Sequence, residues 1–179
     1  MMYNSVAQIF EEIDATRERL SQRVEGLSEE QALARPGADA WTVKEIMEHL
    51  AIIENRLLSM MKMMLAKVEG AAAAAGGGGP VKMKPFTLDH HIERSLREKY
   101  NAPEAVRPSG TVSLADSLAN LARSREELRS LRPRIEATSL SVATYPHPAF
   151  GPLDFYEWLA FVGHHEARHL RQIESMLSS

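Results

Sequence analysis

The sequence contains no cysteine among its 179 residues, and this absence limits the chemistry available to the chain. Disulfides and thiolate metal ligands are both excluded. Any bound transition metal would therefore have to be held by imidazole and carboxylate groups. The candidate ions are then zinc, nickel, iron, manganese and cobalt.

Long apolar runs and clusters of basic residues are also missing. No stretch approaches the roughly 18 apolar residues that a membrane span requires. Met1 to Phe10 lack the basic and apolar regions of a secretion signal, so we expect a cytoplasmic protein without membrane contact. The 21 basic and 24 acidic residues give a net charge of -3, and the basic residues are scattered, often beside acids. This pattern does not predict a nucleic-acid-binding surface.

Apolar residues recur at intervals of three and four in several segments, a spacing that predicts amphipathic helices. The length fits one domain, which we expect to span residues 1–179. The first helix is predicted near the start of the chain and is expected to end at Gly26. Its apolar face consists of Val6, Ile9, Phe10, Ile13, Leu20, Val24 and Leu27.

A second long helix is predicted behind Trp41. Thr42 and Glu45 have the spacing of a capping box, and an apolar stripe follows as far as Val68. Residues 70–80 are expected to form a flexible Ala/Gly loop, although alanines at its start can prolong the helix. Beyond this loop we expect a long crossover that contains a short helix around residues 88–100.

A third helix is predicted from about Ser113 to Glu136, where leucines recur at helical spacing. The segment 145–152 is rich in turn-forming residues, and Asp154 with Glu157 then has the spacing of a capping box for a last helix. No run shows sustained strand alternation. The sequence therefore predicts an all-α protein, a four-helix bundle with a long crossover between helices 2 and 3.

The string His165-Glu166-Ala167-Arg168-His169 is the most informative motif in the chain. Two histidines four apart on one helix face can share a metal ion, and Glu166 between them is a candidate general base, as in zinc metalloproteases. The protease interpretation lacks its downstream ligand, because no histidine follows His169. A third ligand would have to come from upstream.

Several histidines could supply that third ligand. His49 lies at the edge of the apolar stripe of the second helix, where a side chain can reach into a crevice between helices. His90 and His91 in the crossover are an alternative source. His147, between two prolines, is expected in a loop, and His164 is expected on the solvent side of the last helix.

Glu166 has two possible roles. It lies at the margin of the buried stripe, so it can be an acceptor or base beside the metal, or a partly buried salt-bridge partner. Among the nearby aromatic residues, Trp158 is expected in the core. Trp41 is expected to anchor the start of the second helix rather than to contact a ligand, although it could do both.

Two motifs resemble those of the DinB-like superfamily of damage-inducible four-helix metalloproteins. The first is the start Trp41-Thr42-x-x-Glu45-x-x-x-His49. The second is the ending His165-x-x-x-His169-x-x-Gln172-Ile173, preceded by His147-Pro148, Gly151-Pro152-Leu153 and Glu157-Trp158-Leu159. The resemblance extends over essentially the whole chain. Departures from the common pattern are the Ala/Gly tract, the long crossover, and Arg168 where another histidine often stands.

The resemblance implies an up-down-down-up bundle with a divalent transition metal held by His49, His165 and His169. Nickel and zinc are the expected ions, with iron, manganese and cobalt as alternatives. It also implies a small-molecule substrate, a homodimer, and either S-transfer with a low-molecular-weight thiol cosubstrate or hydrolysis. A non-catalytic, stress-linked protein that binds a metal or another ligand is the alternative from a different class.

Overall fold

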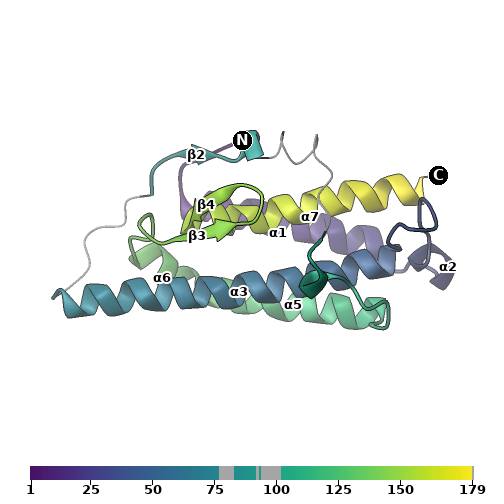
Figure 1. Cartoon of the computed structure of the whole chain (residues 1–179), viewed down its shortest axis with the longest axis horizontal. Helices are drawn as coiled ribbons and strands as arrows, with labels where there is room; N and C mark the ends of the chain where they lie inside the picture. The colour runs from purple at the N-terminus through teal and green to yellow at the C-terminus, as the bar shows by residue number, and fades with distance from the viewer. Residues whose placement is uncertain (77–82, 92, 94–101, 179) are drawn as a thin grey trace.

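The protein forms a bundle of four long helices, seen in a computed structural model that describes residues 1–76, 83–91, 93 and 102–178 (Figure 1). Helix α1 packs along α7, and α3 packs along both α5 and α7. The bundle helices are α1 (Val6–Val24), α3 (Val43–Ala74), α5 (Leu114–Ser130) and α7 (Phe155–Leu177). The predicted fold class is therefore confirmed.

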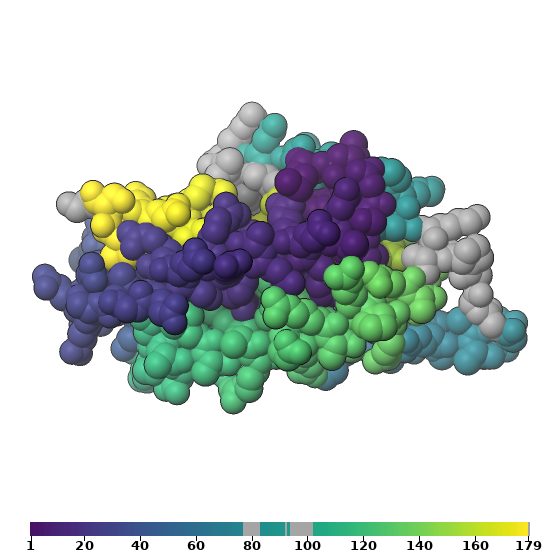
Figure 2. All heavy atoms as spheres, turned by 180° about the vertical axis from the view of Figure 1, so that it is seen from behind, coloured from purple at the N-terminus to yellow at the C-terminus, as the bar shows by residue number. Residues whose placement is uncertain are grey.

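The helices run up, down, down and up, as the family resemblance implied. Helices α1 and α7 point one way along the bundle, whereas α3 and α5 point the other way (Figure 1). Because α3 and α5 are parallel neighbours, the chain between them must return along the length of the bundle. Seen from behind, α1 lies between α7 and α5 (Figure 2).

The predicted capping boxes start both helices that carry the candidate ligands. Thr42 Oγ1 accepts from the Glu45 amide at 3.1 Å, and the Glu45 carboxylate accepts from the Thr42 amide at 2.7 Å. Asp154 and Glu157 form the same reciprocal pair at the start of α7. Each box satisfies amide groups that have no partner inside the helix. These local contacts fix where α3 and α7 begin.

The alanines that follow Gly70 are helical. Helix α3 continues through Ala74, as the alternative expectation allowed, so the loop does not begin at residue 70. Alanine has the highest helix propensity, which explains the extension, and Gly76 with a φ of 84° then leaves the helical conformation. Residues 77–80 of the expected loop lie outside the described residues, and so does most of the short helix expected around 88–100.

The third predicted helix is divided in two. Helix α5 is followed by a short α6 (Arg132–Ala137), and the break falls at Leu131. Pro133 explains the break, because it lacks an amide proton and its ring would clash with the carbonyl of residue 129 in a continuous helix. The single helix expected from Ser113 to Glu136 was therefore wrong at this point.

Short elements accompany the bundle. The turn-rich segment that precedes α7 forms a hairpin in which β3 (Thr144–His147) pairs antiparallel with β4 (Gly151–Asp154), so that His147 faces Gly151. Near the N-terminus, β1 (Met2–Tyr3) pairs with β2 (Phe86–Thr87). The remaining elements are α2 (Glu29–Ala32) and the 3-10 helix η1 (Glu104–Val106).

Close contact between α1 and α7 depends on Gly163. A Cβ atom at this position would lie 2.8 Å from Ile13 Cγ2 and 3.3 Å from Ile13 Cα. Only glycine permits the two helices to approach this closely. Within the described part of the chain, no helix is both long and apolar enough to cross a membrane.

Candidate metal centre

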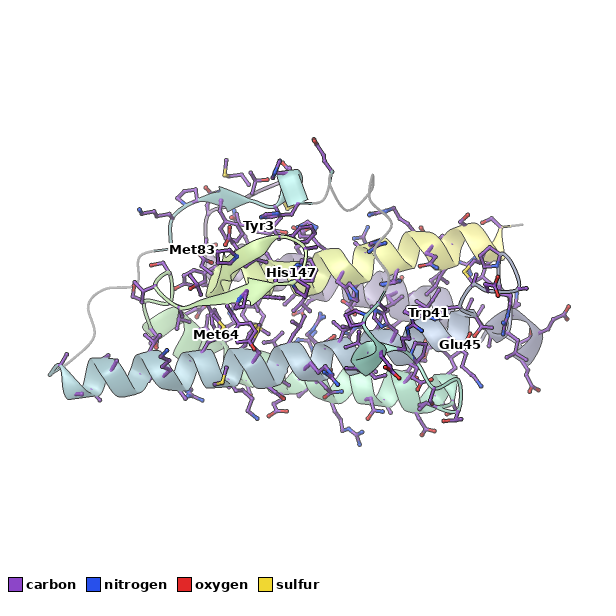
Figure 3. The ribbon with its side chains drawn as sticks, in the orientation of Figure 1. Tyr3, Trp41, Glu45, Met64, Met83 and His147 are labelled. Atoms are coloured by element: carbon purple, nitrogen blue, oxygen red, sulfur yellow. The ribbon has the colours of Figure 1, made fainter. Side chains whose placement is uncertain are left out.

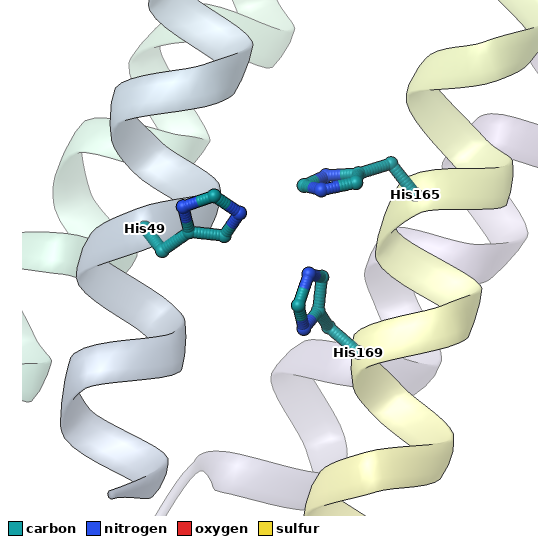
Figure 4. Close-up of side chains that lie close together, drawn as sticks. All are labelled: His49, His165 and His169. Atoms are coloured by element: carbon teal, nitrogen blue, oxygen red, sulfur yellow. The ribbon is translucent and has the colours of Figure 1, made fainter. Parts of the chain in front are cut away.

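His49, His165 and His169 meet between α3 and α7 (Figure 4). Each offers one ring nitrogen, and these atoms all lie within 4.8 Å of one another. The centroid of the His49 ring lies 5.2 Å from the centroid of each of the other two rings. Because imidazole nitrogens bind transition metals at about 2.0–2.1 Å, the rings can share one ion after small rotations.

Hydrogen bonds hold two of the rings in a defined orientation. His49 Nδ1 lies 2.7 Å from the Val106 carbonyl oxygen, which can only accept, so Nδ1 carries the proton. His169 Nδ1 lies 3.1 Å from Gln172 Oε1 in the same way. In both rings Nε2 keeps its lone pair. This is the usual arrangement of a metal-binding histidine, in which a partner on one nitrogen directs the other at the ion.

The surroundings of the site keep the three imidazoles neutral. Burial lowers the pKa of His169 to about 3, with a further contribution from His49. Burial also lowers the pKa of His49, and it lowers that of His165 well below the usual value. A neutral imidazole is the form that binds a metal, so each ring is available as a ligand at pH 7.

The carbonyl that orients His49 is held in place by the neighbouring residue Glu48. Its carboxylate accepts from the Ser109 amide at 2.8 Å, the Ser109 hydroxyl at 2.7 Å and the Gly110 amide at 2.9 Å. These bonds fasten the segment that follows η1 to the side of α3. Sequence reasoning missed Glu48, because its partners lie more than sixty residues away and no motif connects them.

The donor set fits a divalent transition metal. Within the described residues, the cluster contains three imidazoles and no carboxylate or thiolate. Nitrogen ligands suit zinc, nickel, copper and iron better than magnesium or calcium, which prefer oxygen. Three protein ligands are also the number found in catalytic zinc sites, where a further position stays open.

Glu166 lies beside the site and is engaged by two arginines. Its Oε1 accepts from Arg17 Nε at 2.5 Å, and its Oε2 accepts from Arg125 Nη2 at 3.0 Å. Burial raises the pKa of Glu166, while the two guanidinium groups oppose that rise. Of its two expected roles, the structure shows the salt-bridge role, and the side chain is buried more fully than expected. Its role as a general base stays a prediction.

Aromatic rings border the three histidines. The Trp41 ring lies 4.8 Å from that of His49, and the Phe161 ring lies 6.0 Å from that of His165. Figure 3 shows Trp41 close to the beginning of α3. Trp41 therefore contacts a candidate ligand as well as the start of the helix. Trp158 is buried as expected and donates to the Tyr145 carbonyl oxygen at 3.0 Å.

His147 is part of the hairpin and not of an irregular loop, which corrects the expectation from its flanking prolines. Its ring stacks on that of Phe150, with the centroids 4.3 Å apart, and lies 4.8 Å from that of Phe161. Its Nδ1 accepts from the amides of Ala149 and Phe150, which leaves the proton on Nε2. Burial lowers the pKa of His147 to about 4. The ring therefore extends the aromatic border of the site.

The other histidines lie outside the cluster. His164 was expected in solvent but is half-buried, and its Nε2 lies 3.0 Å from the Tyr3 hydroxyl. This expectation was wrong because β1 covers that face of α7, which helical periodicity cannot reveal. His90 and His91, the alternative third ligands, do not belong to the three-histidine group.

Known proteins resemble this chain over most of its length. YuaE of Bacillus subtilis (strain 168), an uncharacterized protein, is 26% identical over 159 residues, which cover 86% of this chain and 87% of YuaE. The crystal structure of the four-helix bundle protein TT2238 aligns with a TM-score of 0.62 at 21% identity, covering 95% of this chain and 98% of TT2238.

A further structural neighbour is YfiT from Bacillus subtilis, described as a probable metal-dependent hydrolase with an unusual four-helix bundle topology. It aligns with a TM-score of 0.56 at 17% identity, covering 98% of this chain and 91% of YfiT. Both structural matches show the shared fold. A sequence model described as the DinB superfamily matches residues 12–173, so the chain belongs to the DinB superfamily.

Proposed function

We propose that the protein is a metal-dependent enzyme that acts on a small molecule, with a divalent transition metal held by His49, His165 and His169. The observation that carries the proposal is the convergence of the three rings. In His49 and His169, Nδ1 is hydrogen-bonded to the protein, and Nε2 is free to bind the metal. The description of YfiT as a probable metal-dependent hydrolase supports it. Nickel and zinc are the ions that we expect.

The protein residues define what chemistry the site can perform. A divalent ion at an open site lowers the pKa of a water molecule or a thiol and so supplies a nucleophile at neutral pH. The aromatic rings of Trp41 and Phe161 border the histidines. With water as the nucleophile the reaction is hydrolysis, and with a low-molecular-weight thiol it is S-transfer.

Glu166 is a poor candidate for proton transfer in this reaction. To accept a proton, its carboxylate would have to give up a charge-assisted bond to Arg17 or Arg125. The same contacts disfavour the metalloprotease interpretation, which needs this glutamate as a base. We propose instead that Glu166 stabilises the bundle beside the ligands.

The first test is metal content. Protein purified without a His tag is expected to contain close to one transition metal ion per chain by elemental analysis, and His49→Ala is expected to lose it. His90→Ala, an exposed histidine outside the cluster, is the matched control and should keep the metal. Stoichiometric metal in His49→Ala would refute the three-histidine site.

Activity separates an enzyme from a non-catalytic metal-binding protein. Metal-loaded protein would be screened with several thiols and electrophiles and with small hydrolysable esters and amides. Turnover that disappears in His49→Ala would establish an enzyme and distinguish S-transfer from hydrolysis. Full metal occupancy without turnover in any of these assays would favour the non-catalytic alternative. The expected homodimer stays a prediction, which light scattering after size-exclusion chromatography tests.

A further inference from the structure

Arg168 occupies a distinctive position beside the three histidines. It lies on α7 between His165 and His169. At about 100° per residue, Arg168 lies roughly 60° from His165 on one flank of the histidine face, whereas Glu166 lies about 100° away on the other flank. Glu166 is bonded to Arg17 and Arg125 inside the bundle, and Arg168 lies on the opposite flank of the histidine face. The Arg168 side chain is half-buried.

Within the part of the chain that the structure describes, no carboxylate neutralises the charge of Arg168. Across residues 1–76, 83–91, 93 and 102–178, it forms no ion pair with a carboxylate, in contrast to Arg17 and Arg125. A guanidinium group has five N–H donors, and a partly buried one is normally paired. Its positive charge contributes to the lowered pKa of all three histidines, which is consistent with a position beside them.

Three acidic residues around the site are engaged with other partners. Glu166 and Glu54 are paired with two arginines. Glu48 accepts three hydrogen bonds from Ser109 and Gly110. Three neutral imidazoles, a divalent ion and the Arg168 guanidinium would therefore give the site a positive potential, which favours an anionic ligand.

We propose that Arg168 binds a carboxylate group of the substrate. The site would then select small molecules that carry both a carboxylate and an atom that binds the metal. This inference rests on the proposed metal-dependent function. A planar guanidinium matches a carboxylate with two parallel hydrogen bonds, and a single arginine is sufficient for it. The aromatic rings of Trp41 and Phe161 offer an apolar surface to the rest of the substrate.

The test compares two probes that differ only in the anionic group. Cobalt(II)-loaded protein would be titrated with 3-mercaptopropionate and with its neutral amide, and binding would be followed by the sulfur-to-cobalt absorption band. The carboxylate is expected to bind at least about tenfold more tightly than the amide. Arg168→Gln should remove this preference, while its cobalt content and its affinity for the amide stay unchanged.

Matched variants make the result specific. Arg171→Gln changes an exposed arginine on the same helix and should retain the preference. Arg168→Lys should keep only part of it, because lysine preserves the charge without the planar fork. Equal affinity of the wild type for both probes, or an unchanged preference in Arg168→Gln, would overturn the inference alone. Failure of the wild type to bind cobalt would overturn the proposed function and this inference together.

Discussion

Two buried polar clusters lie next to each other in this bundle and differ in how their polar groups are satisfied. One is the ion quartet, formed by Arg17, Glu54, Arg125 and Glu166, which come one each from α1, α3, α5 and α7. The other is the three-histidine site between α3 and α7. A cavity of about 10 Å³ is lined by residues of both clusters.

The charges of the ion quartet balance one another. Each arginine contacts both glutamates, so that the four charges form a closed ring with no net charge. Each guanidinium also donates to a backbone carbonyl oxygen, that of Leu121 for Arg17 and that of Ile13 for Arg125. Burial opposes the charge on Arg125, but the carboxylates of Glu166 and Glu54 raise its pKa above the usual value.

The histidines differ because their rings face one another between α3 and α7. Val106 and Gln172 satisfy the outer nitrogens of two rings, and the inner nitrogens converge. Buried polar groups that form hydrogen bonds with each other stabilise the fold. Buried nitrogen lone pairs that converge on one point indicate a binding site for a metal ion. The comparison predicts that changes in the quartet reduce stability and that changes around the histidines reduce metal affinity.

The largest effect is expected from removing one arginine of the quartet. Arg125→Met leaves two buried carboxylates with only Arg17 between them, and the loss of one partner from a buried pair costs about 3–5 kcal/mol. The free energy of unfolding from urea denaturation measures this change. Arg129→Met removes a half-exposed arginine one turn later and should cost less than about 1 kcal/mol. Equal losses in the two variants would contradict the role assigned to the quartet.

Glu166→Gln distinguishes the two clusters directly. It removes the charge of Glu166 but keeps a similar shape, so we expect a loss of about 1.5–3 kcal/mol in the free energy of unfolding. Metal affinity should change less than about threefold, because no ligand or ligand partner is altered. A large loss of turnover at full metal occupancy, without a matching loss of stability, would instead support the general-base role.

Gln172→Ala is expected to act on the metal site and not on the fold. It removes the acceptor at His169 Nδ1, and loss of such a partner typically lowers metal affinity by about 10–100-fold. Competition with a chelating dye measures the dissociation constant. Glu174→Ala, an exposed residue on the same helix, is the control. Unchanged affinity in Gln172→Ala would show that the hydrogen bond does not orient the ligand.

The smallest effect concerns stability of the metal-free protein at mildly acidic pH. The folded-state pKa of His169, about 3, lies below the unfolded value of about 6.5, so the unfolded chain binds a proton more readily below pH 6.5. Lowering the pH from 7 to 5.5 should cost about 1 kcal/mol through His169 alone. Denaturation at both pH values should show a smaller decrease in His169→Gln. An equal decrease would remove His169 as the cause.

Much of the bundle follows from interactions between residues close in sequence. The capping pairs Thr42 with Glu45 and Asp154 with Glu157 determine where two helices start, and a spacing of four puts His165 and His169 on one face. The break before α6 was also predictable, because Pro133 interrupts the hydrogen bonding of the helix turn that precedes it. These features need only helical periodicity and the properties of single residues.

The polar contacts between different segments of the bundle join residues that are far apart in the sequence. Arg17 and Glu166 are 149 positions apart, Glu48 and Gly110 are 62 apart, and His49 and Val106 are 57 apart. Each pairing depends on how helices pack and where the crossover returns, and no local pattern encodes either. Local patterns predict the four long helices and the pairing of His165 with His169 on one helix face. Packing brings the His49 ring to the other two, as the family resemblance implied, and it places Glu166 against two arginines.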